Sequence, residues 1–313
     1  MKNNLRFTTA HRYYQLFLII CSMCILFCLT TSFLCSKGKV KDMRVDTVVF
    51  SFDRPLQLYA YLESAEKYLS NVNETHVIYR ASNNAYDNGY QIVAQRFPRV
   101  LFHKQSTNPQ NDFKSLVWAS VYSNTSICQY VMFAVDDIII KDSVDMQECT
   151  RALEDYKAWG FYLRLGKNIN YCYMLNRPTA PPKGKDMGNL FCWKFCDGDG
   201  DWAYPNNVDN TIYRKKDILS YLKKEPFTNP NYLEGHWQKW RDMKGKGICF
   251  QTSKNINIPL NLVNPSYNRN NHLFTPAELL QKFQQGLKID ILKFHQVNNN
   301  APHVDYQPAF IMR

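Results

Sequence analysis

The sequence has no long basic stripe, although it carries 38 Lys and Arg residues against 27 Asp and Glu and a formal net charge of +11. A basic domain can bind nucleic acid, an anionic membrane surface or a phosphorylated ligand. Here the basic residues are scattered along the chain, and no RNA-binding motif occurs. We therefore expect no nucleic-acid partner, and we favour a membrane surface or a phosphorylated ligand.

Sequence motifs of several enzyme classes are also absent. No stretch resembles a Walker loop, a nucleophile elbow or the helix of a zinc protease. Among the ten cysteines, Cys192 and Cys196 lack the second close pair that is usual in a structural zinc site. We therefore expect neither a P-loop nucleotide hydrolase nor a zinc knuckle. The six cysteines beyond residue 100 are even in number, which leaves disulfides open.

Acidic residues are missing before Asp42, and the apolar stretch 16–34 carries no charge at all. About 20 such residues span the roughly 30 Å core of a bilayer as a helix. Basic residues flank the stretch on both sides, so the charge rule does not orient it. A cleaved signal peptide is the alternative, but its apolar region is usually shorter. The sequence thus predicts a membrane location, with a basic tail over 1–15, a single transmembrane anchor over 16–35 and a linker over 36–44.

The first half of the remaining chain alternates strands with helices. Apolar and β-branched runs predict strands, and apolar residues at helical spacing predict helices. The expected strands cover residues 46–52, 75–80, 100–103 and 131–135, and the expected helices cover 56–69, 90–97 and 113–123. Such alternation is the signature of an α/β layer structure that binds a nucleotide.

The second half is richer in loops. Between residues 171 and 210, Pro, Gly, Asn and Asp are mixed with large aromatic side chains. A stretch of this kind shapes a substrate pocket over a rigid sheet, with an irregular surface region as the alternative. Beyond it we expect a strand from Thr211, helices over 217–224, 234–243 and 276–285, the last capped by Thr275 and Glu278, and an extended tail from Ala301.

Two adjacent carboxylates, Asp136 and Asp137, follow the strand expected over 131–135. That run is apolar on both faces, as in a buried parallel strand, and ligands of α/β sheets bind beyond the carboxyl ends of such strands. Carboxylate oxygens at this edge can hold Mg²⁺ or Mn²⁺ against substrate phosphates. The alternative for an isolated Asp-Asp pair is a surface turn between two strands.

Taken in order, three motifs resemble those of a GT-A type glycosyltransferase. Residues 51–55, Ser-Phe-Asp-Arg-Pro, resemble the family's nucleotide-sugar-binding opening, and residues 134–137, Ala-Val-Asp-Asp, resemble its DxD-type metal motif. Residues 229–237, Asn-Pro-Asn-Tyr-Leu-Glu-Gly-His-Trp, resemble the helix start that carries an acidic catalytic residue. The resemblance covers residues 45–272.

The resemblance implies a fold and an activity. The fold is α/β, with Rossmann-type α/β/α layers around a mixed, mostly parallel sheet in a domain over 45–313. Its nucleotide-sugar-binding half would cover 45–145, and its acceptor-binding half would cover 146–313. The implied reaction moves a sugar from a nucleotide-sugar donor to a hydroxyl of a glycan, lipid or protein, with Mn²⁺ or Mg²⁺ as cofactor. The N-terminal helix adds the membrane as a partner.

The resemblance also assigns the metal. A strict DxD motif needs an acid at Ala134 or Val135, and this chain instead has its two acids side by side. Asp137 would coordinate the metal directly, and Asp136 would contact the ribose or reach the metal through water. His272 or His303 would supply the further ligand that the family often takes from its C-terminal part. A lone histidine is more often simply hydrogen-bonded.

The remaining roles concern the donor and the acceptor. Asp53 and Arg54 would lie where the base and ribose bind, unless they form an exposed turn. Glu234 would be the general base toward an acceptor hydroxyl in an inverting reaction, or a carboxylate interacting with a helix dipole. Asp209 and Asp201 are rival acids near the same pocket.

Two further residues and two further functions remain open. Trp202 and Tyr204 would stack against a sugar face, or belong to the core. A domain that binds carbohydrate or a partner without catalysis would fit the same sequence. So would another metal-dependent phosphoryl-transfer enzyme, although such enzymes usually need more clustered acids than Asp142 and Asp145 add.

Overall fold

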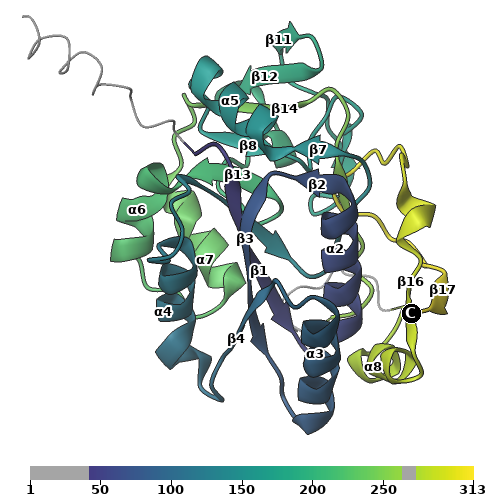
Figure 1. Ribbon diagram of the computed structural model, residues 1–313. Coiled ribbons are helices and arrows are strands. Elements are labelled where there is room, and N and C mark those ends of the chain that lie inside the picture. The colour runs from purple at the N-terminus through teal and green to yellow at the C-terminus, as the bar shows by residue number, and fades with distance from the viewer. Residues whose placement is uncertain (1–41, 263–272) are drawn as a thin grey trace, which may run out of the picture. The chain divides into compact units, whose positions relative to one another are not determined.

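The four strands expected in the first half all join one large sheet (Figure 1). The computed structural model describes residues 42–262 and 273–313. Nine strands form the sheet in the order β11-β12-β14-β8-β13-β5-β1-β3-β4. Their bounds are β1 (Val45–Phe52), β3 (Val72–Arg80), β4 (Leu101–Lys104), β5 (Tyr130–Val135), β8 (Gly160–Tyr162), β11 (Gly184–Met187), β12 (Leu190–Lys194), β13 (Thr211–Arg214) and β14 (Lys246–Phe250).

Seven of these nine strands point the same way. Strand β1 is parallel to β3 and β5, β3 is parallel to β4, and β14 is parallel to β8. Strand β13 lies antiparallel between β5 and β8, and β12 lies antiparallel between β14 and β11. The mixed, mostly parallel sheet is therefore confirmed, with β12 and β13 as the two reversed strands.

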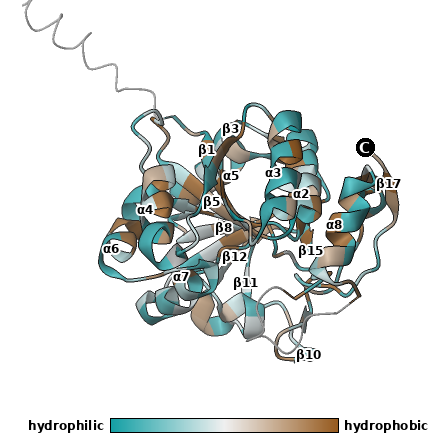
Figure 2. Cartoon of the chain, turned by 90° about the horizontal axis from the view of Figure 1, so that it is seen from below, coloured by the Kyte–Doolittle hydropathy of each residue, from teal (hydrophilic) through white to brown (hydrophobic). Residues whose placement is uncertain are grey.

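Helices cover both faces of the sheet (Figures 1 and 2). Because successive side chains of a strand alternate in direction, Val49 of β1 packs with one set of helices and Val48 with the other. The helices on the Val49 face are α2 (Pro55–Tyr68), α3 (Asn84–Arg96) and α8 (Pro276–Gln284), with α5 (Met146–Tyr156) farther along the same face. The helices on the Val48 face are α4 (Pro109–Val121), α6 (Lys215–Lys224) and α7 (Pro230–Trp237). The central strands β1 and β5 are thus buried on both sides, which explains their continuous apolar runs.

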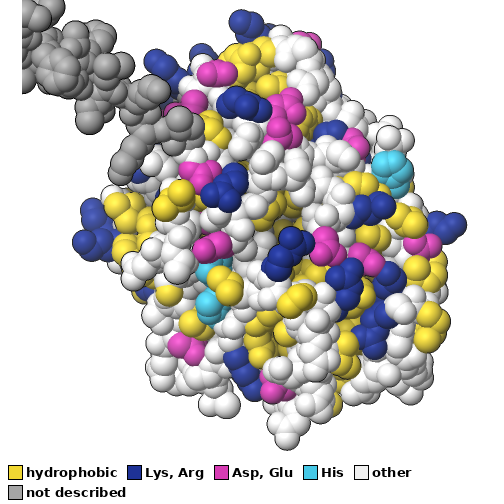
Figure 3. Space-filling model, in the orientation of Figure 1, with side chains coloured by type: hydrophobic (Ala, Val, Ile, Leu, Met, Phe, Trp, Pro, Cys, Tyr) yellow, Lys and Arg dark blue, Asp and Glu magenta, His cyan; other side chains and the backbone are white. Residues whose placement is uncertain are grey.

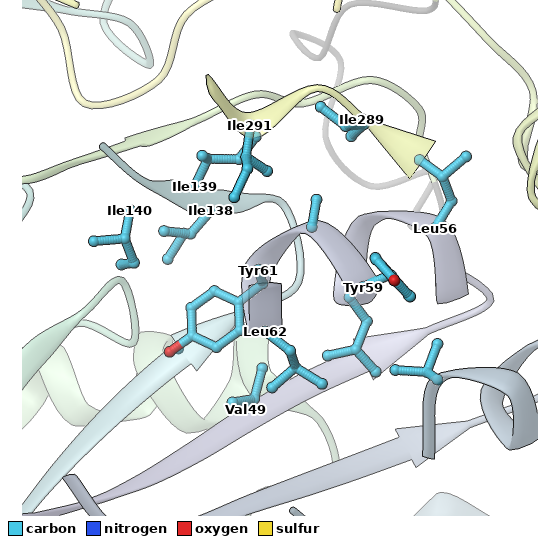
Figure 4. Packing of buried hydrophobic residues seen from close by; sticks show 14 of the residues in the cluster. Val49, Leu56, Tyr59, Tyr61, Leu62, Ile138, Ile139, Ile140, Ile289 and Ile291 are labelled. Atoms are coloured by element: carbon cyan, nitrogen blue, oxygen red, sulfur yellow. The ribbon is translucent and has the colours of Figure 1, made fainter. Parts of the chain in front are cut away.

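Helix α2 is enclosed between the large sheet and smaller strands (Figure 4). Its Leu62 lies toward Val49 of β1, and Ile138, Ile139 and Ile291 lie on its other side. These isoleucines belong to β6 (Ile138–Ile140), which pairs with β15 (Asn255–Asn257), and to the segment after β16 (Leu287–Ile289), which pairs with β17 (Phe310–Met312). The packing fixes the turn after β5 against the start of α2.

Several helices begin earlier than expected because a side chain caps them. Asn83 accepts hydrogen bonds from the amides of Ala85 and Tyr86, so α3 starts at Asn84 rather than at residue 90. The capping box of Thr275 and Glu278 at the start of α8 is confirmed. The helix expected over 234–243 is wrong in its bounds.

That helix, α7, starts four residues sooner than expected, where Asn229 accepts from the amide of Tyr232 and Pro230 occupies the first turn. It ends at Trp237 in a 3₁₀ turn over Gln238–Trp240. Helix α5 and strands β8, β11, β12 and β14 were not expected at all. The remaining short elements are β2 (Leu69–Ser70), β7 (Val144–Asp145), β9 (Tyr171–Cys172), β10 (Arg177–Pro178) and three 3₁₀ turns at Phe195–Asp197, Gly200–Ala203 and Ile291–Phe294.

The aromatic stretch between residues 171 and 210 builds a core of its own. Trp193 and Trp202 are fully buried, and their rings meet edge to face with centroids 4.9 Å apart. Both indole N–H groups donate to carbonyls, Trp193 to that of Trp202 and Trp202 to that of Ile169. Stacking of Trp202 on a sugar is therefore wrong, because a satisfied, buried indole offers no free face.

The predicted tail over 1–15 and anchor over 16–35 lie outside the described residues, as does most of the linker over 36–44. Within 42–262 and 273–313, no helix is both long and apolar enough to cross a membrane. On the face drawn in Figure 3, Lys and Arg side chains are interspersed with Asp and Glu. Five of the six cysteines beyond residue 100 are free thiols: Cys149, Cys172, Cys192, Cys196 and Cys249.

Candidate active site

The carboxyl ends of the adjacent parallel strands β1 and β5 bring Ser51 and Asp136 together. The Ser51 hydroxyl donates to Asp136 Oδ2 at 2.8 Å, and it lies 2.7 Å from the Tyr90 hydroxyl of α3. Asp136 is almost fully buried. The edge of the sheet where the sequence placed a ligand site is therefore polar and enclosed.

The guanidinium of Arg54 fills the space between the two sheet-edge acids. Its Nη1 donates to Asp136 Oδ1 at 3.1 Å and to Asp137 Oδ2 at 3.4 Å. On its other side, Nε donates to Asn261 Oδ1 at 2.9 Å and Nη2 to the Asn261 carbonyl at 2.6 Å. Arg54 is buried, so the exposed turn that was the alternative for this residue is wrong.

Burial and the neighbouring charges act in opposite directions on Asp136. Desolvation raises its pKa, Arg54 lowers it and the charge of Asp137 raises it, and the net result is a pKa of about 6. Burial alone would lower the pKa of Arg54, but its two carboxylate partners raise it above the usual value. The guanidinium therefore stays charged and holds the acid pair in place.

Asp137 is the more accessible acid of the pair. Its side chain is 14 % exposed against 4 % for Asp136. Its Oδ1 lies 3.5 Å from Asn257 Nδ2, and its carbonyl accepts from the amide of Ile258. These contacts aim the carboxylate away from the sheet core, where a ligand can reach it.

Asp209 reaches the same edge because β13 is reversed. Strand β13 runs antiparallel to β5, so the residues before β13 lie beside the residues at the end of β5. The Asn210 amide accordingly donates to the Phe133 carbonyl of β5 at 2.8 Å. Burial raises the pKa of Asp209, His303 and Arg164 lower it, and Asp137 raises it. His303 Nε2 lies 3.8 Å from Asp209 Oδ2.

Arg164, two residues beyond β8, is a second buried arginine at this edge. Its Nη1 donates to Asp201 Oδ1 at 2.7 Å and lies 3.9 Å from Asp209 Oδ2. Within the described residues its Nε and Nη2 have no hydrogen-bond partner. Buried N–H groups are almost always paired in folded proteins, so these two point to a ligand or solvent oxygen.

Glu234 is a further acid at this edge, and with Asp137 and Asp209 it forms the acid cluster. It lies five residues after the Asn229 cap, outside the first turn of α7, so interaction with the helix dipole does not explain it. Its Oε1 accepts from the Val208 amide at 3.2 Å, next to Asp209 in the chain. Burial, followed by the charge of Asp209, raises the pKa of Glu234 to about 8, although Arg164 opposes the shift.

The donor set fits a divalent cation at Asp137 and not at Asp136. Both Asp136 oxygens accept close hydrogen bonds, from Ser51 at 2.8 Å and from Arg54 at 3.1 Å, and the side chain is only 4 % exposed. The Asp137 oxygens have longer contacts, at 3.4 and 3.5 Å, and its side chain is 14 % exposed. Within the described residues, no three His, Cys, Asp or Glu side chains are grouped to hold a metal. Mg²⁺ nevertheless binds through one or two carboxylates together with substrate phosphates, which one accessible carboxylate satisfies. The other predicted ligand, His272, lies outside the described residues.

Asp53 is part of a turn and does not join the acid cluster. Its backbone has φ = +53°, and its Oδ1 accepts from the Ser82 amide at 2.8 Å, which ties the end of β1 to the loop before α3. Sequence reasoning missed Arg164, Asn257 and Asn261. A charged residue directly after the apolar run at 160–163 was the available signal for Arg164.

The sequence is similar to that of a glycosyltransferase. Over 202 residues it is 32% identical to the bifunctional glycosyltransferase pgtA of Dictyostelium discoideum. The match takes in 59% of this chain and 26% of the relative, so the chain spans about a quarter of that protein's length. No protein-family model matches the chain.

Solved structures give weaker likenesses. The mannosyltransferase PcManGT of Pyrobaculum calidifontis, with GDP-Man and Mn²⁺, superposes with a TM-score of 0.40 at 11% identity over 71% of this chain and 61% of its own. S. aureus TarS with UDP gives 0.39 at 13% identity over 57% and 48%. The 4-diphosphocytidyl-2C-methyl-D-erythritol synthase of Anaerococcus prevotii gives 0.37 at 10% over 78% and 97%. TM-scores of this size do not establish a shared fold.

Proposed function

We propose that this protein is a glycosyltransferase that moves a sugar from a nucleotide-sugar donor to a hydroxyl acceptor. One observation carries the proposal: Asp137, Asp209 and Glu234 come from separate segments to one sheet edge, beside two buried arginines. The 32% identity with a glycosyltransferase supports the same class.

The donor would bind at the Asp137 side of this cluster. Asp137 would hold Mn²⁺ or Mg²⁺, and the cation would supply Lewis-acid stabilisation of the diphosphate leaving group. Arg54 fixes the carboxylate of Asp137 and neutralises Asp136. The unpaired N–H groups of Arg164 offer hydrogen bonds to donor oxygens.

The acceptor would bind at the Glu234 side. A general base must lose its own proton first, and a pKa near the working pH combines availability with basicity. Glu234 would take the proton of the acceptor hydroxyl, and Asp209, whose charge raises the pKa of Glu234, would tune its basicity. This assignment belongs to an inverting reaction.

We also propose that the helix expected over 16–35 anchors the protein in a membrane as a single span. The apolar length of that stretch supports the proposal. A full-length protein that sediments with membranes and resists alkaline carbonate, beside a soluble chain lacking residues 1–44, is the expected result. Full-length protein released by carbonate would contradict it.

A panel of nucleotide sugars tests the catalytic proposal. We expect one donor to be hydrolysed slowly without acceptor in the presence of Mn²⁺ or Mg²⁺, and the rate to collapse in EDTA. Asp137→Asn should lower the rate by about 100-fold or more, since the cation loses its carboxylate. Asp155→Asn, an exposed acid on α5, is the matched control and should behave as wild type.

Each outcome separates one hypothesis from another. Full activity in EDTA would reject the cation, while leaving sugar transfer possible through Arg54 and Arg164. Binding of a nucleotide sugar with neither hydrolysis nor transfer would favour the non-catalytic binding domain. Turnover of phosphate esters without any sugar transfer would favour the phosphoryl-transfer alternative.

A further inference from the structure

A cavity of about 380 Å³ opens between the β9–β10 hairpin and the C-terminal tail. Its polar lining residues are Tyr171, Tyr173, Asn176, Asn300, His303 and Asp305. This volume falls in the range of small-ligand sites and is too small for a folded partner. The cavity therefore suits one compact molecule or the end of a longer one.

The cavity adjoins the candidate active site through His303. This residue lines the cavity, and its Nε2 lies 3.8 Å from Asp209 Oδ2. The tail that carries it is fixed to Asn257, whose amide donates to the Pro302 carbonyl and whose carbonyl accepts from the amide of Val304. The Asn257 side chain also lies beside Asp137, so the segment that lines the cavity is tied to the segment beside this acid.

The lining combines aromatic faces with amide and carboxylate groups. The ring of Tyr173 stacks on that of His303, with the ring centroids 6.0 Å apart. The Tyr173 hydroxyl donates a hydrogen bond to Asp305, and the Tyr171 hydroxyl donates one to Asn176. Sugar rings present an apolar C–H face and a rim of hydroxyls, which match a tyrosine ring and amide or carboxylate oxygens respectively. Only Ala301 and Val304 among the lining residues are aliphatic, which is too little apolar surface for a lipid chain.

We propose that this cavity binds a sugar residue of a glycan acceptor and presents its hydroxyl to the acid cluster. This inference rests on the proposed function for the direction of transfer, whereas sugar binding in the cavity is testable without any turnover. It narrows the acceptor classes of glycan, lipid and protein to glycan. The described lining comes from two short segments, residues 171–176 and 300–305, which is little length for pairing with an extended peptide.

The test uses the full chain and a panel of methyl glycosides of neutral hexoses, 6-deoxyhexoses and N-acetylhexosamines. Saturation-transfer NMR and titration calorimetry measure their binding without donor. We expect at least one glycoside to bind, and Asn300→Ala and Tyr171→Ala each to weaken its Kd at least tenfold. Asn300 suits this purpose because its side chain is exposed and its carbonyl keeps the bonds from the amides of Asn170 and Tyr171.

Two matched variants make the result specific. Leu175→Ala changes an exposed residue of the same hairpin that does not line the cavity, and should leave the Kd unchanged. Tyr171→Phe keeps the ring and should retain most of the affinity. The melting temperature of each variant should equal that of the wild type, which serves as the control for folding.

Failure of this inference differs from failure of the proposed function. Donor hydrolysis with no glycoside bound, or with Asn300→Ala binding as tightly as wild type, overturns the sugar cavity and leaves the enzyme class intact. Transfer to a serine peptide or a long-chain alcohol but to no glycoside also overturns it. Glycoside binding that responds to Asn300→Ala supports the cavity even if no donor is turned over.

Discussion

Arg54 governs what the two sheet-edge acids can do. A buried carboxylate without a partner is costly, and Asp136 is buried beside a second acid. The guanidinium supplies one cation to both, and its other N–H groups are satisfied by Asn261. Because Asp136 is held by this contact and by Ser51, Asp137 is left as the acid that can respond to a ligand.

Removing the positive charge of Arg54 should therefore lower the stability of the folded protein. We expect Arg54→Met to lower the free energy of unfolding by about 3–5 kcal/mol at pH 7, because it leaves a buried charge unpaired. Adding Asp136→Asn to Arg54→Met should recover part of this loss. Urea denaturation of the three proteins measures both effects, and a loss below about 1 kcal/mol in the single variant would show that the pair is not structural.

Glu234 should make both activity and stability depend on pH. Its pKa is raised to about 8 from the ordinary 4.5. If it is the base, kcat/KM for the acceptor should rise up to about pH 8, and Glu234→Gln should lose 10²- to 10⁴-fold in rate, a range typical of a missing general base. A pH–rate profile of the wild type and the variant checks this, and a flat profile would exclude Glu234.

The raised pKa of Glu234 should make stability fall as pH rises, whereas activity should rise. An acid whose folded-state pKa is raised binds its proton more tightly when folded, so the free energy of unfolding falls as pH rises between 4.5 and about 8. Glu234→Gln removes this dependence. The melting temperature of the variant should therefore decline less than that of the wild type over this interval, measured in matched buffers.

At the scale of elements, α2 lies between two sheets and has little freedom to rearrange. Its Tyr61 is fully buried, and within the described residues its hydroxyl has no hydrogen-bond partner. Tyr90 of the neighbouring α3 is equally buried, but its hydroxyl meets Ser51 and accepts from the Arg54 amide at 3.1 Å. Comparing the two tyrosines therefore measures how much a hydrogen-bonded hydroxyl contributes to stability relative to an unpaired one.

Removal of these hydroxyls should have opposite effects. Tyr61→Phe should be neutral or stabilise by up to about 1 kcal/mol, because it deletes an unpaired polar group. Tyr90→Phe should destabilise by about 1–3 kcal/mol, because it leaves Ser51 and the Arg54 amide without that partner. Chemical denaturation compares them directly. Equal losses in both variants would mean that Tyr61 has a partner after all.

At the scale of the whole molecule, the sequence was sufficient to predict the strands and helices of the first half. Apolar runs there coincide with strands, of which β1 and β5 are buried on both faces, and the order of strands and helices is the observed one. The sequence also placed Asp136 and Asp137 at a sheet edge. What it could not supply was the partner of that pair, because the Arg54 contact depends on α2 packing between two sheets.

The second half was predicted only in part: β13, α6 and α8 were expected, whereas β8, β11, β12 and β14 were not. Strands β8 and β13 are only three and four residues long, and their direction is set by pairing with β5 and β14 rather than by their own pattern. Without the reversal of β13, nothing in the spacing places Asp209 near Asp137. The aromatic stretch over 171–210 led to a wrong prediction for Trp202, because Trp193 and Trp202 fill a core, whereas Tyr171 and Tyr173 line the cavity.

Two truncations should separate the tail's contributions. A chain ending at Pro308 loses β17, its pairing with β16 and the hydrogen bonds of Arg313 to Phe283 and Gly286, and should melt a few degrees lower but still hydrolyse donor. A chain ending at Asn299 also loses His303 and the bonds to Asn257, and should lose activity with the cavity. Activity in the shorter chain would show that His303 and the cavity are dispensable.

The reversal of β13 has a consequence for how the protein is made. Synthesis is vectorial, and domains generally fold in order from the N-terminus. Strand β5 leads into Asp136 and Asp137, but Asp209 joins them only with β13, the Asn261 contacts of Arg54 come later still, and His303 arrives almost a hundred residues after Asp209. The site is therefore complete only when almost the whole described chain has been synthesised, so a chain that ends early lacks part of the acid cluster and of its supporting contacts.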